Sequence, residues 1–287
     1  MRSRLEPYLY VTPLVALLLF VFGYPVAKMV EFSLKMVRGI DGPWVGFQNF
    51  KLVLGQDLFW TSVGHNLQLL LAIPVLLGLS VFAAALLNEQ PAGWKMMRSI
   101  VFLPFILAIP VVAVIAKQML QFDGPVNETL RGTGLEGVAL DWLGSPDVAL
   151  FTLASVITWR EAALGTILVL ARMMSIDESH TEAARLEGAN WWQRLRHVIV
   201  PQSWSVIEFL GVLGIITMVS AIFAYVYMIG GGRGGPGTST MVLELYVFNA
   251  LTRMSLPGIA AAVCIMLLAV CLVVMVPYFV FRRRGQD

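Results

Sequence analysis

The chain has 287 residues, of which 58% are hydrophobic and 13% are charged, and its formal net charge is +2. This composition and a strongly positive mean hydropathy exclude an ordinary soluble globular domain and indicate that most of the chain lies in a lipid bilayer. The small net charge gives no sign of the basic surface that nucleic-acid binding requires.

Apolar stretches long enough to cross a bilayer recur along the chain. A helix needs about 20 mostly apolar residues to span a hydrocarbon core of about 30 Å. Six stretches meet this requirement, at about residues 8–30, 67–88, 99–120, 148–172, 204–229 and 257–281. The first follows Arg2 and Arg4 but lacks a small-x-small cleavage site, so we expect it to be retained. The sequence predicts an all-α membrane protein of six transmembrane helices, with one domain over residues 1–287.

The basic residues indicate how these helices are oriented. Six spans put both termini on one side, and the segments on that side contain Arg2, Arg4, Lys95, Arg98, Arg172, Arg185, Arg194, Arg196, Arg282, Arg283 and Arg284. Basic residues in the opposite segments are fewer and are mixed with acidic ones. Because loops rich in lysine and arginine stay in the cytoplasm, we expect cytoplasmic N and C termini and a multi-pass protein of a bacterial or archaeal cytoplasmic membrane.

No constellation of residues predicts covalent chemistry. His65, His180 and His197 lie in different loops or at span ends, without the spacing of a metal site. The chain has no glycine-rich phosphate loop followed by Lys-Ser or Lys-Thr, and no serine in a nucleophile-elbow pattern. We therefore expect a chain that is not an enzyme and binds no metal or cofactor itself.

The longest predicted cytoplasmic loop, residues 173–203, carries a polar helix. Ser175 and Glu178 have the spacing of a capping box, which predicts a helix start there. Good helix formers follow from Glu182 to Glu187, and Gly188 is a natural stop, so we expect a helix within residues 175–190. The residues alone leave two interpretations open, an interfacial helix and a docking helix for a partner.

Ordered motifs extend from this loop over nearly the whole chain. The loop contains Glu182-Ala183-Ala184, then Gly188 after three residues, then Pro201 after a hydrophobic run. Further motifs are Gly23-Tyr24-Pro25, the segment 45–50, Asn66, Phe102-Leu103-Pro104, Trp159, and Gly234-Gly235-Pro236 with Thr238 and Thr240. This series resembles the permeases of binding-protein-dependent ABC importers, in the carbohydrate-uptake branch.

The resemblance implies a type I importer fold and a set of partners. Two non-identical permease subunits would form a heterodimer around the pathway for a sugar solute. Two ATPase subunits would bind ATP and magnesium, and a soluble or lipid-anchored binding protein would deliver the solute from outside. Membrane lipid would surround the chain, and no nucleic acid is implied.

The resemblance also assigns residues. The loop helix would be the coupling helix seated in the ATPase, through Glu182, Ala183, Ala184, Arg185, Glu187 and Gly188. Glu182 would make the main polar contact. The solute pathway would involve Trp159, Arg160, Glu161, Gly214, Met218, Ser220 and Ala221. Ionisable residues at the depth of Arg160 and Glu161 are functional candidates by default, although pairing with other spans or with the second permease explains them equally well.

Three alternatives remain at this stage. A permease for glycerol phosphate or a related phosphodiester would need several basic residues on the pathway, and Arg160 is one. An ion-coupled secondary transporter would show an inverted repeat and broken helices in the membrane, and the sequence has no clear repeat. A membrane-embedded enzyme would need an acid-base or metal set.

Overall fold

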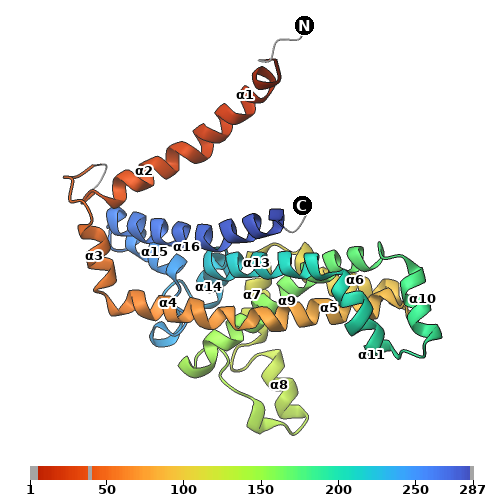
Figure 1. The fold of residues 1–287 in the computed structure, drawn as a ribbon. Coiled ribbons are helices and arrows are strands. Elements are labelled where there is room, and N and C mark those ends of the chain that lie inside the picture. The colour runs from red at the N-terminus through yellow and green to blue at the C-terminus, as the bar shows by residue number, and fades with distance from the viewer. Residues whose placement is uncertain (1–5, 38–40, 285–287) are drawn as a thin grey trace. The chain divides into compact units, whose positions relative to one another are not determined.

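The computed structural model describes residues 6–37 and 41–284 as helices joined by loops, with an isolated β-bridge between Lys35 and Trp44 (Figure 1). The elements in chain order are α1 (Glu6–Leu18), η1 (Leu19–Gly23), α2 (Tyr24–Ser33), α3 (Gln48–Leu54), α4 (Asp57–Leu70), α5 (Ala72–Asn88), α6 (Trp94–Ile106), α7 (Ile109–Met119), α8 (Pro125–Gly132), η2 (Glu136–Val138), α9 (Pro146–Met173), α10 (Glu178–Leu186), α11 (Trp191–Arg194), η3 (Leu195–Ile199), α12 (Val200–Gln202), α13 (Trp204–Ser220), α14 (Phe223–Ile229), η4 (Pro236–Thr238), α15 (Leu243–Thr252) and α16 (Pro257–Arg284). Arg2 and Arg4, used above to predict orientation, lie outside the described residues, as do the side chains of Arg282, Arg283 and Arg284.

Long apolar helices confirm the all-α class. Within the described ranges, four helices are long and apolar enough to cross a membrane: Tyr10–Ser33, Asp57–Asn88, Pro146–Met173 and Pro257–Tyr278. They contain or overlap four of the predicted spans. There are also two bent helix pairs, Trp94–Ile106 with Ile109–Met119 and Trp191–Gln202 with Trp204–Ser220. If each pair crosses the membrane once, the number of spans is six.

The predicted span 99–120 is not one straight helix. It consists of α6 and α7, which are bent by 103° at Leu107 and Ala108. Pro110 explains the break, because proline lacks an N–H and its ring would collide with the carbonyl of Ile106 in a continuous helix. The chain therefore leaves the helix with extended backbone at Ala108 and starts again with Pro110 in the first turn.

The predicted span 204–229 is also interrupted. Helix α13 ends at Ser220, and α14 begins at Phe223 after two residues with non-helical backbone. Neither glycine nor proline marks this break. A distant side chain stabilises it: the carboxylate of Glu244 accepts a hydrogen bond from the N–H of Ile222 at 2.8 Å and caps the start of α14.

The chain divides into two compact units. One contains the described residues up to Trp60 together with Tyr246–Val273. In this unit the buried amide of Asn49 donates to the carbonyl oxygens of Ser33 and Lys35, each at 2.9 Å. A Cβ at Gly258 would lie 2.5 Å from the Lys35 carbonyl oxygen, so only glycine allows α16 to begin this close to the end of α2.

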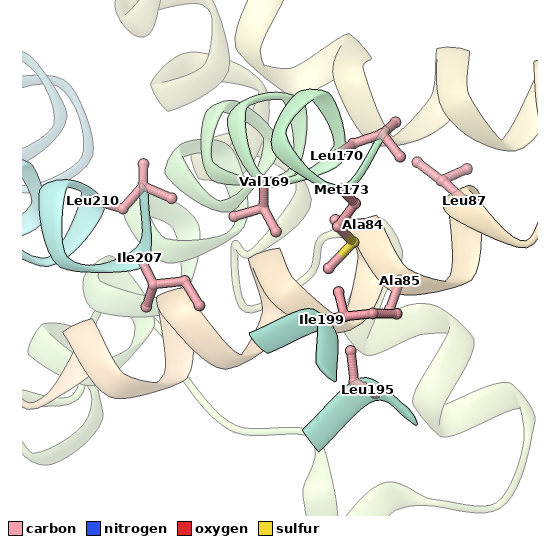
Figure 2. Close-up of a cluster of buried hydrophobic side chains, with 10 residues drawn as sticks. All are labelled: Ala84, Ala85, Leu87, Val169, Leu170, Met173, Leu195, Ile199, Ile207 and Leu210. Atoms are coloured by element: carbon pink, nitrogen blue, oxygen red, sulfur yellow. The ribbon is translucent and has the colours of Figure 1, made fainter. Parts of the chain in front are cut away.

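The other unit, Thr61–Leu245 with the end of α16, is built on the packing of α5 against α9. These helices approach closely where a Cβ at Gly165 would lie 2.2 Å from the Ser80 hydroxyl oxygen. That hydroxyl donates to the Leu76 and Ala162 carbonyl oxygens, so it is satisfied within the contact. Towards Asn88 and Met173, the two helices share a buried apolar cluster with η3 and α13 (Figure 2). Its members are Ala84, Ala85, Leu87, Val169, Leu170, Met173, Leu195, Ile199, Ile207 and Leu210.

Candidate functional site

The polar helix of the loop 173–203 is α10, and it begins later than the sequence predicts. Its N-cap is Asp177, whose carboxylate accepts a hydrogen bond from the N–H of Ser179 at 2.9 Å. The predicted capping box from Ser175 is wrong, because the Ser175 hydroxyl donates to the Arg172 carbonyl oxygen and continues the end of α9. The hydrogen bonds from Ser179 lower the pKa of the Asp177 carboxyl, so the cap is charged at neutral pH.

The predicted stop at Gly188 is confirmed. Helix α10 ends at Leu186, and Gly188 has φ +83°, a left-handed conformation that favours glycine. Two hydrogen bonds close the end, from the N–H of Gly188 to the carbonyl of Arg185 and from the N–H of Ala189 to the carbonyl of Ala184. This is the pattern of a Schellman motif, so local hydrogen bonds close both ends of α10.

The side chains of α10 are available for a partner. None is buried, and Glu182, Ala183, Arg185, Glu187 and Gly188 are all exposed, with Ala184 half-buried. Leu186 is 90% exposed, which is unusual for a large apolar side chain next to polar residues. Sequence reasoning passed over Leu186, because a leucine in a helix pattern is ordinarily assigned to a core.

The segment after α10 is fixed to the helix bundle. Leu195 and Ile199 belong to the cluster of Figure 2, where they face α5 and α9. The Trp191 ring makes an edge contact with Phe82, whereas Trp192 is 58% exposed. A tryptophan ring at the membrane interface keeps one side accessible, and of the two rings Trp192 has that exposure. The polar helix α10 is therefore followed by a segment that packs firmly against α5 and α9.

A buried ion pair lies in the middle of α9. The Arg160 guanidinium is 2.8 Å from a Glu161 carboxylate oxygen, and both side chains are at least 85% buried. Neighbouring positions on a helix point about 100° apart, so helix geometry alone does not predict this pairing. The long arginine side chain closes the distance.

Arg160 also contacts the break between α6 and α7. It donates to the carbonyl oxygens of Phe105 and Leu107 at 3.4 and 3.3 Å, and its guanidinium lies 5.1 Å from the centre of the Phe105 ring. The bend frees these carbonyls from helical hydrogen bonds, and a bilayer offers them no water. These contacts join Arg160 to another predicted span, as the interpretation of pairing between spans expects.

Glu161 faces the fifth predicted span. The Tyr225 hydroxyl of α14 donates to the same Glu161 oxygen at 3.1 Å. A small cavity of about 20 Å³ beside Glu161 is also lined by Gly214 and Met218 of α13. A water molecule needs about 10–15 Å³ of such space, so the cavity is no larger than one or two waters. The structure thus brings together three predicted pathway residues, Glu161, Gly214 and Met218.

The other predicted pathway residues lie elsewhere. Trp159 is 56% exposed and lines a separate groove of about 490 Å³, formed mainly by apolar side chains of α5, α6 and α9. The Ser220 hydroxyl donates back to the Ile216 carbonyl oxygen, and Ala221 is exposed at the break after α13. Trp159 therefore does not stack over the Arg160–Glu161 pair as a single site would require.

Two polar residues that the sequence did not single out organise the unit. Glu244 caps α14, and Glu89 at the end of α5 pairs with Arg194. An acidic residue within an apolar segment is a weak signal for Glu244, and none distinguishes Glu89 from a solvated helix end. Among the described residues, no three or more His, Cys, Asp or Glu side chains are grouped so as to hold a metal ion.

Comparisons with known proteins cover nearly the whole chain. Residues 67–285 match the family described as binding-protein-dependent transport system inner membrane component. The lactose transport system permease protein LacF of Rhizobium radiobacter is 29% identical over 98% of this chain and 96% of its own length. The trehalose/maltose transport system permease protein MalF of Thermococcus litoralis is 28% identical over 98% of this chain and 94% of its own.

The fold has a solved counterpart. A chain from the crystal structure of a bacterial ABC transporter involved in the import of the acidic polysaccharide alginate superposes with a TM-score of 0.84, at 24% identity. The similarity covers 98% of this chain and 96% of that chain. The backbone described above is therefore shared with that chain over almost its full length.

Proposed function

Because the chain belongs to the family of binding-protein-dependent transport system inner membrane components, we propose that it is the permease subunit of an ATP-driven importer for a sugar. The family consists of transport components and not of enzymes, and its members are multi-pass proteins of the inner membrane. Support for a sugar comes from the relatives, which include permeases named for lactose and for trehalose and maltose.

The observation that carries the proposal is α10. A helix with no buried side chain, closed at both ends and mounted on the packed segment 191–199, suits a rigid contact for a partner. We assign α10 as the coupling helix that docks on an ATPase, with Glu182 as the main polar contact and Ala183, Ala184, Arg185, Glu187 and Gly188 around it. ATP and magnesium would be bound by that partner.

The complete importer would contain further subunits. A second, non-identical permease would share the pathway, two ATPase subunits would drive it, and an extracytoplasmic binding protein would supply the solute. A solved alginate ABC transporter of the same fold is in complex with a periplasmic protein that carries an alginate pentasaccharide, which supports the last of these partners. The larger number of lysines and arginines in the segments on the side of α10 supports a cytoplasmic location for that loop and for both termini.

The chemistry of the proposed pathway favours a neutral or polar solute. The cavity beside Glu161 is lined by one charged side chain, which is acidic, and Arg160 is engaged by Glu161 and two carbonyls. A glycerol phosphate permease would instead present unpaired basic groups. The breaks after Ile106 and Ser220 are the feature that a secondary transporter would need, but membership of the family supports ATP-driven import.

Affinity purification from the native membrane in mild detergent tests the proposal. We expect an ATPase and a second six-span permease to co-purify with the chain. Glu182→Lys should lower recovery of the ATPase about tenfold or more while leaving the second permease bound, because the reversed charge lies in the proposed contact. Glu136→Lys, an equal charge reversal in the outer segment, is the matched control. Isolation of a homo-oligomer that transports without ATP would refute the proposal.

A further inference from the structure

Two arginines of the coupling segment converge on one carboxylate at the end of α5. Glu89, the C-cap of α5, is 3.2 Å from Arg194 of α11 through one oxygen and 3.8 Å from Arg185 of α10 through the other. Glu89 is far from both arginines in the sequence, because α6, α7, α8 and α9 lie between them. The three side chains therefore close a triangle between α5, α10 and α11.

Arg194 is the firmer of the two partners. Its side chain is 12% exposed, and its second amino group donates to the Ala189 carbonyl oxygen at 3.4 Å. The next residue, Asn190, forms a capping box with Gln193, so the link between α10 and α11 is pinned from both sides. Glu89 therefore pairs with an arginine that is itself hydrogen-bonded to the link between α10 and α11.

A cavity of about 460 Å³ lies between α10 and the ends of α5 and α9, next to these ion pairs. It is lined by Asn88 and Gln90 after α5, by Met173 and Met174 at the end of α9, and by Thr181 and Arg185 of α10. Helix α10 contributes no buried side chain, and its Arg185 forms an ion pair with Glu89 at the end of α5.

We infer that Glu89 is a positioning residue that transmits displacement of the coupling helix to α5, by tying Arg185 and Arg194 to the end of that helix. The inference rests on the proposed function, since it requires α10 to move with an ATPase. The long contact of α5 with α9 would then carry the movement to the buried pair at Arg160 and Glu161.

Hydrogen exchange on the purified chain tests the geometry without an ATPase. Glu89→Gln should speed exchange of the amides at residues 185–194 by roughly threefold to tenfold, as expected for the loss of a partly exposed ion-pair network. Arg194→Gln should have a smaller effect in the same direction, and the double variant should exchange no faster than Glu89→Gln alone, because Glu89→Gln already removes the pairing with Arg194. Additive effects would overturn the pairing. Glu178→Gln removes an acid that lines the same cavity without an ion pair among the described residues, and it should leave these amides unchanged.

The same measurement on the complete importer tests transmission. With ATP, magnesium and vanadate, exchange should change both in α10 and in the last turn of α5 of the unaltered complex. In the Glu89→Gln complex the change in α10 should persist while the change in α5 falls to a third or less. An equal response of α5 in both complexes would overturn the role of Glu89. No response of α10 in the unaltered complex would instead contradict the coupling assignment itself.

Discussion

Two charged residues form hydrogen bonds to helix ends at the breaks in this chain. The charge of each residue is opposite to the partial charge of the helix end that it contacts. Arg160 donates to carbonyls at the end of α6, and Glu244 accepts from an N–H at the start of α14. Helix carboxyl ends carry partial negative charge and amino ends partial positive charge, so a cation and an anion respectively stabilise them. Arg160, which the resemblance assigns to the solute pathway, is thus also a structural part of the break after α6.

Removing Arg160 should therefore destabilise the chain. Arg160→Met leaves the Glu161 carboxylate buried beside two unsatisfied carbonyls, which typically costs about 3–5 kcal/mol when one partner of a buried pair is removed. The midpoint of unfolding by SDS, followed by circular dichroism, should fall accordingly. The double variant Arg160→Met/Glu161→Gln removes the stranded charge and should recover part of the loss. An Arg160→Met protein as stable as the unaltered chain would contradict the cap.

The cap of α10 depends on the ionised form of Asp177. Its pKa is lowered in the folded chain, so the stabilisation is complete above the unfolded carboxyl's pKa of about 3.9 and is lost as the pH falls through the lower folded value. At neutral pH, Asp177→Ala should accelerate hydrogen exchange of the first turn of α10. Asp177→Asn keeps an acceptor at the N-cap and should change it little. Equal exchange in the two variants would argue against the cap.

At the scale of helices, the sequence predicted the six apolar stretches but missed the breaks within two of them, one beside a proline and one beside a distant acidic side chain. Pro110 stands in the printed sequence and explains the bend after Ile106, although the hydropathy of residues 99–120 concealed it. The break after Ser220 has no local signal, since it depends on Glu244 in the next segment. The stop at Gly188 was predictable because one residue type meets a positive φ without strain.

Packing of α5 on α9 makes a direct prediction at Gly165. An alanine Cβ there would meet the Ser80 hydroxyl oxygen at 2.2 Å and its Cβ at 2.8 Å, so the helices must separate. We expect Gly165→Ala to destabilise the chain by about 1–3 kcal/mol, as overpacking does. Gly211→Ala on α13 is the control, because its Cβ would meet Leu77 at an ordinary 3.8 Å and alanine favours a helix. In SDS unfolding, Gly165→Ala should lower the midpoint, whereas Gly211→Ala should raise it.

At the scale of the whole molecule, the sequence predicted the class, the family and the polar helix α10, but it did not predict how the proposed pathway residues group. The apolar stretches indicated the class, the order of motifs indicated the family, and the helix formers before Gly188 indicated α10. Trp159 and Glu161 lie two positions apart on the continuous helix α9, so they point about 200° apart around its axis and line different spaces. Pairing of Arg160 with Glu161 depends on side-chain reach, which helix geometry alone does not give.

Cysteine labelling can test the proposed orientation of the chain in the membrane. In a chain with Cys264 and Cys271 replaced by alanine, a cysteine at Glu187 should react with a membrane-impermeant maleimide only after the cytoplasmic face is opened. A cysteine at Glu136 should react from outside in intact cells. Both positions are exposed in the chain, and the labelling is made without the ATPase that would cover Glu187, so accessibility to the reagent depends on the side of the membrane. The reverse pattern would invert the proposed topology.

The self-contained caps of α10 bear on how such a chain can evolve. Asp177 and Gly188 terminate the helix by themselves, and no side chain between them enters the bundle. Residues 178–187 can therefore change together with an ATPase surface without disturbing the interior, provided that an arginine remains at 185. Exchange of residues 178–187 between related permeases should accordingly change which ATPase the proposed coupling helix binds, while the transported solute stays the same.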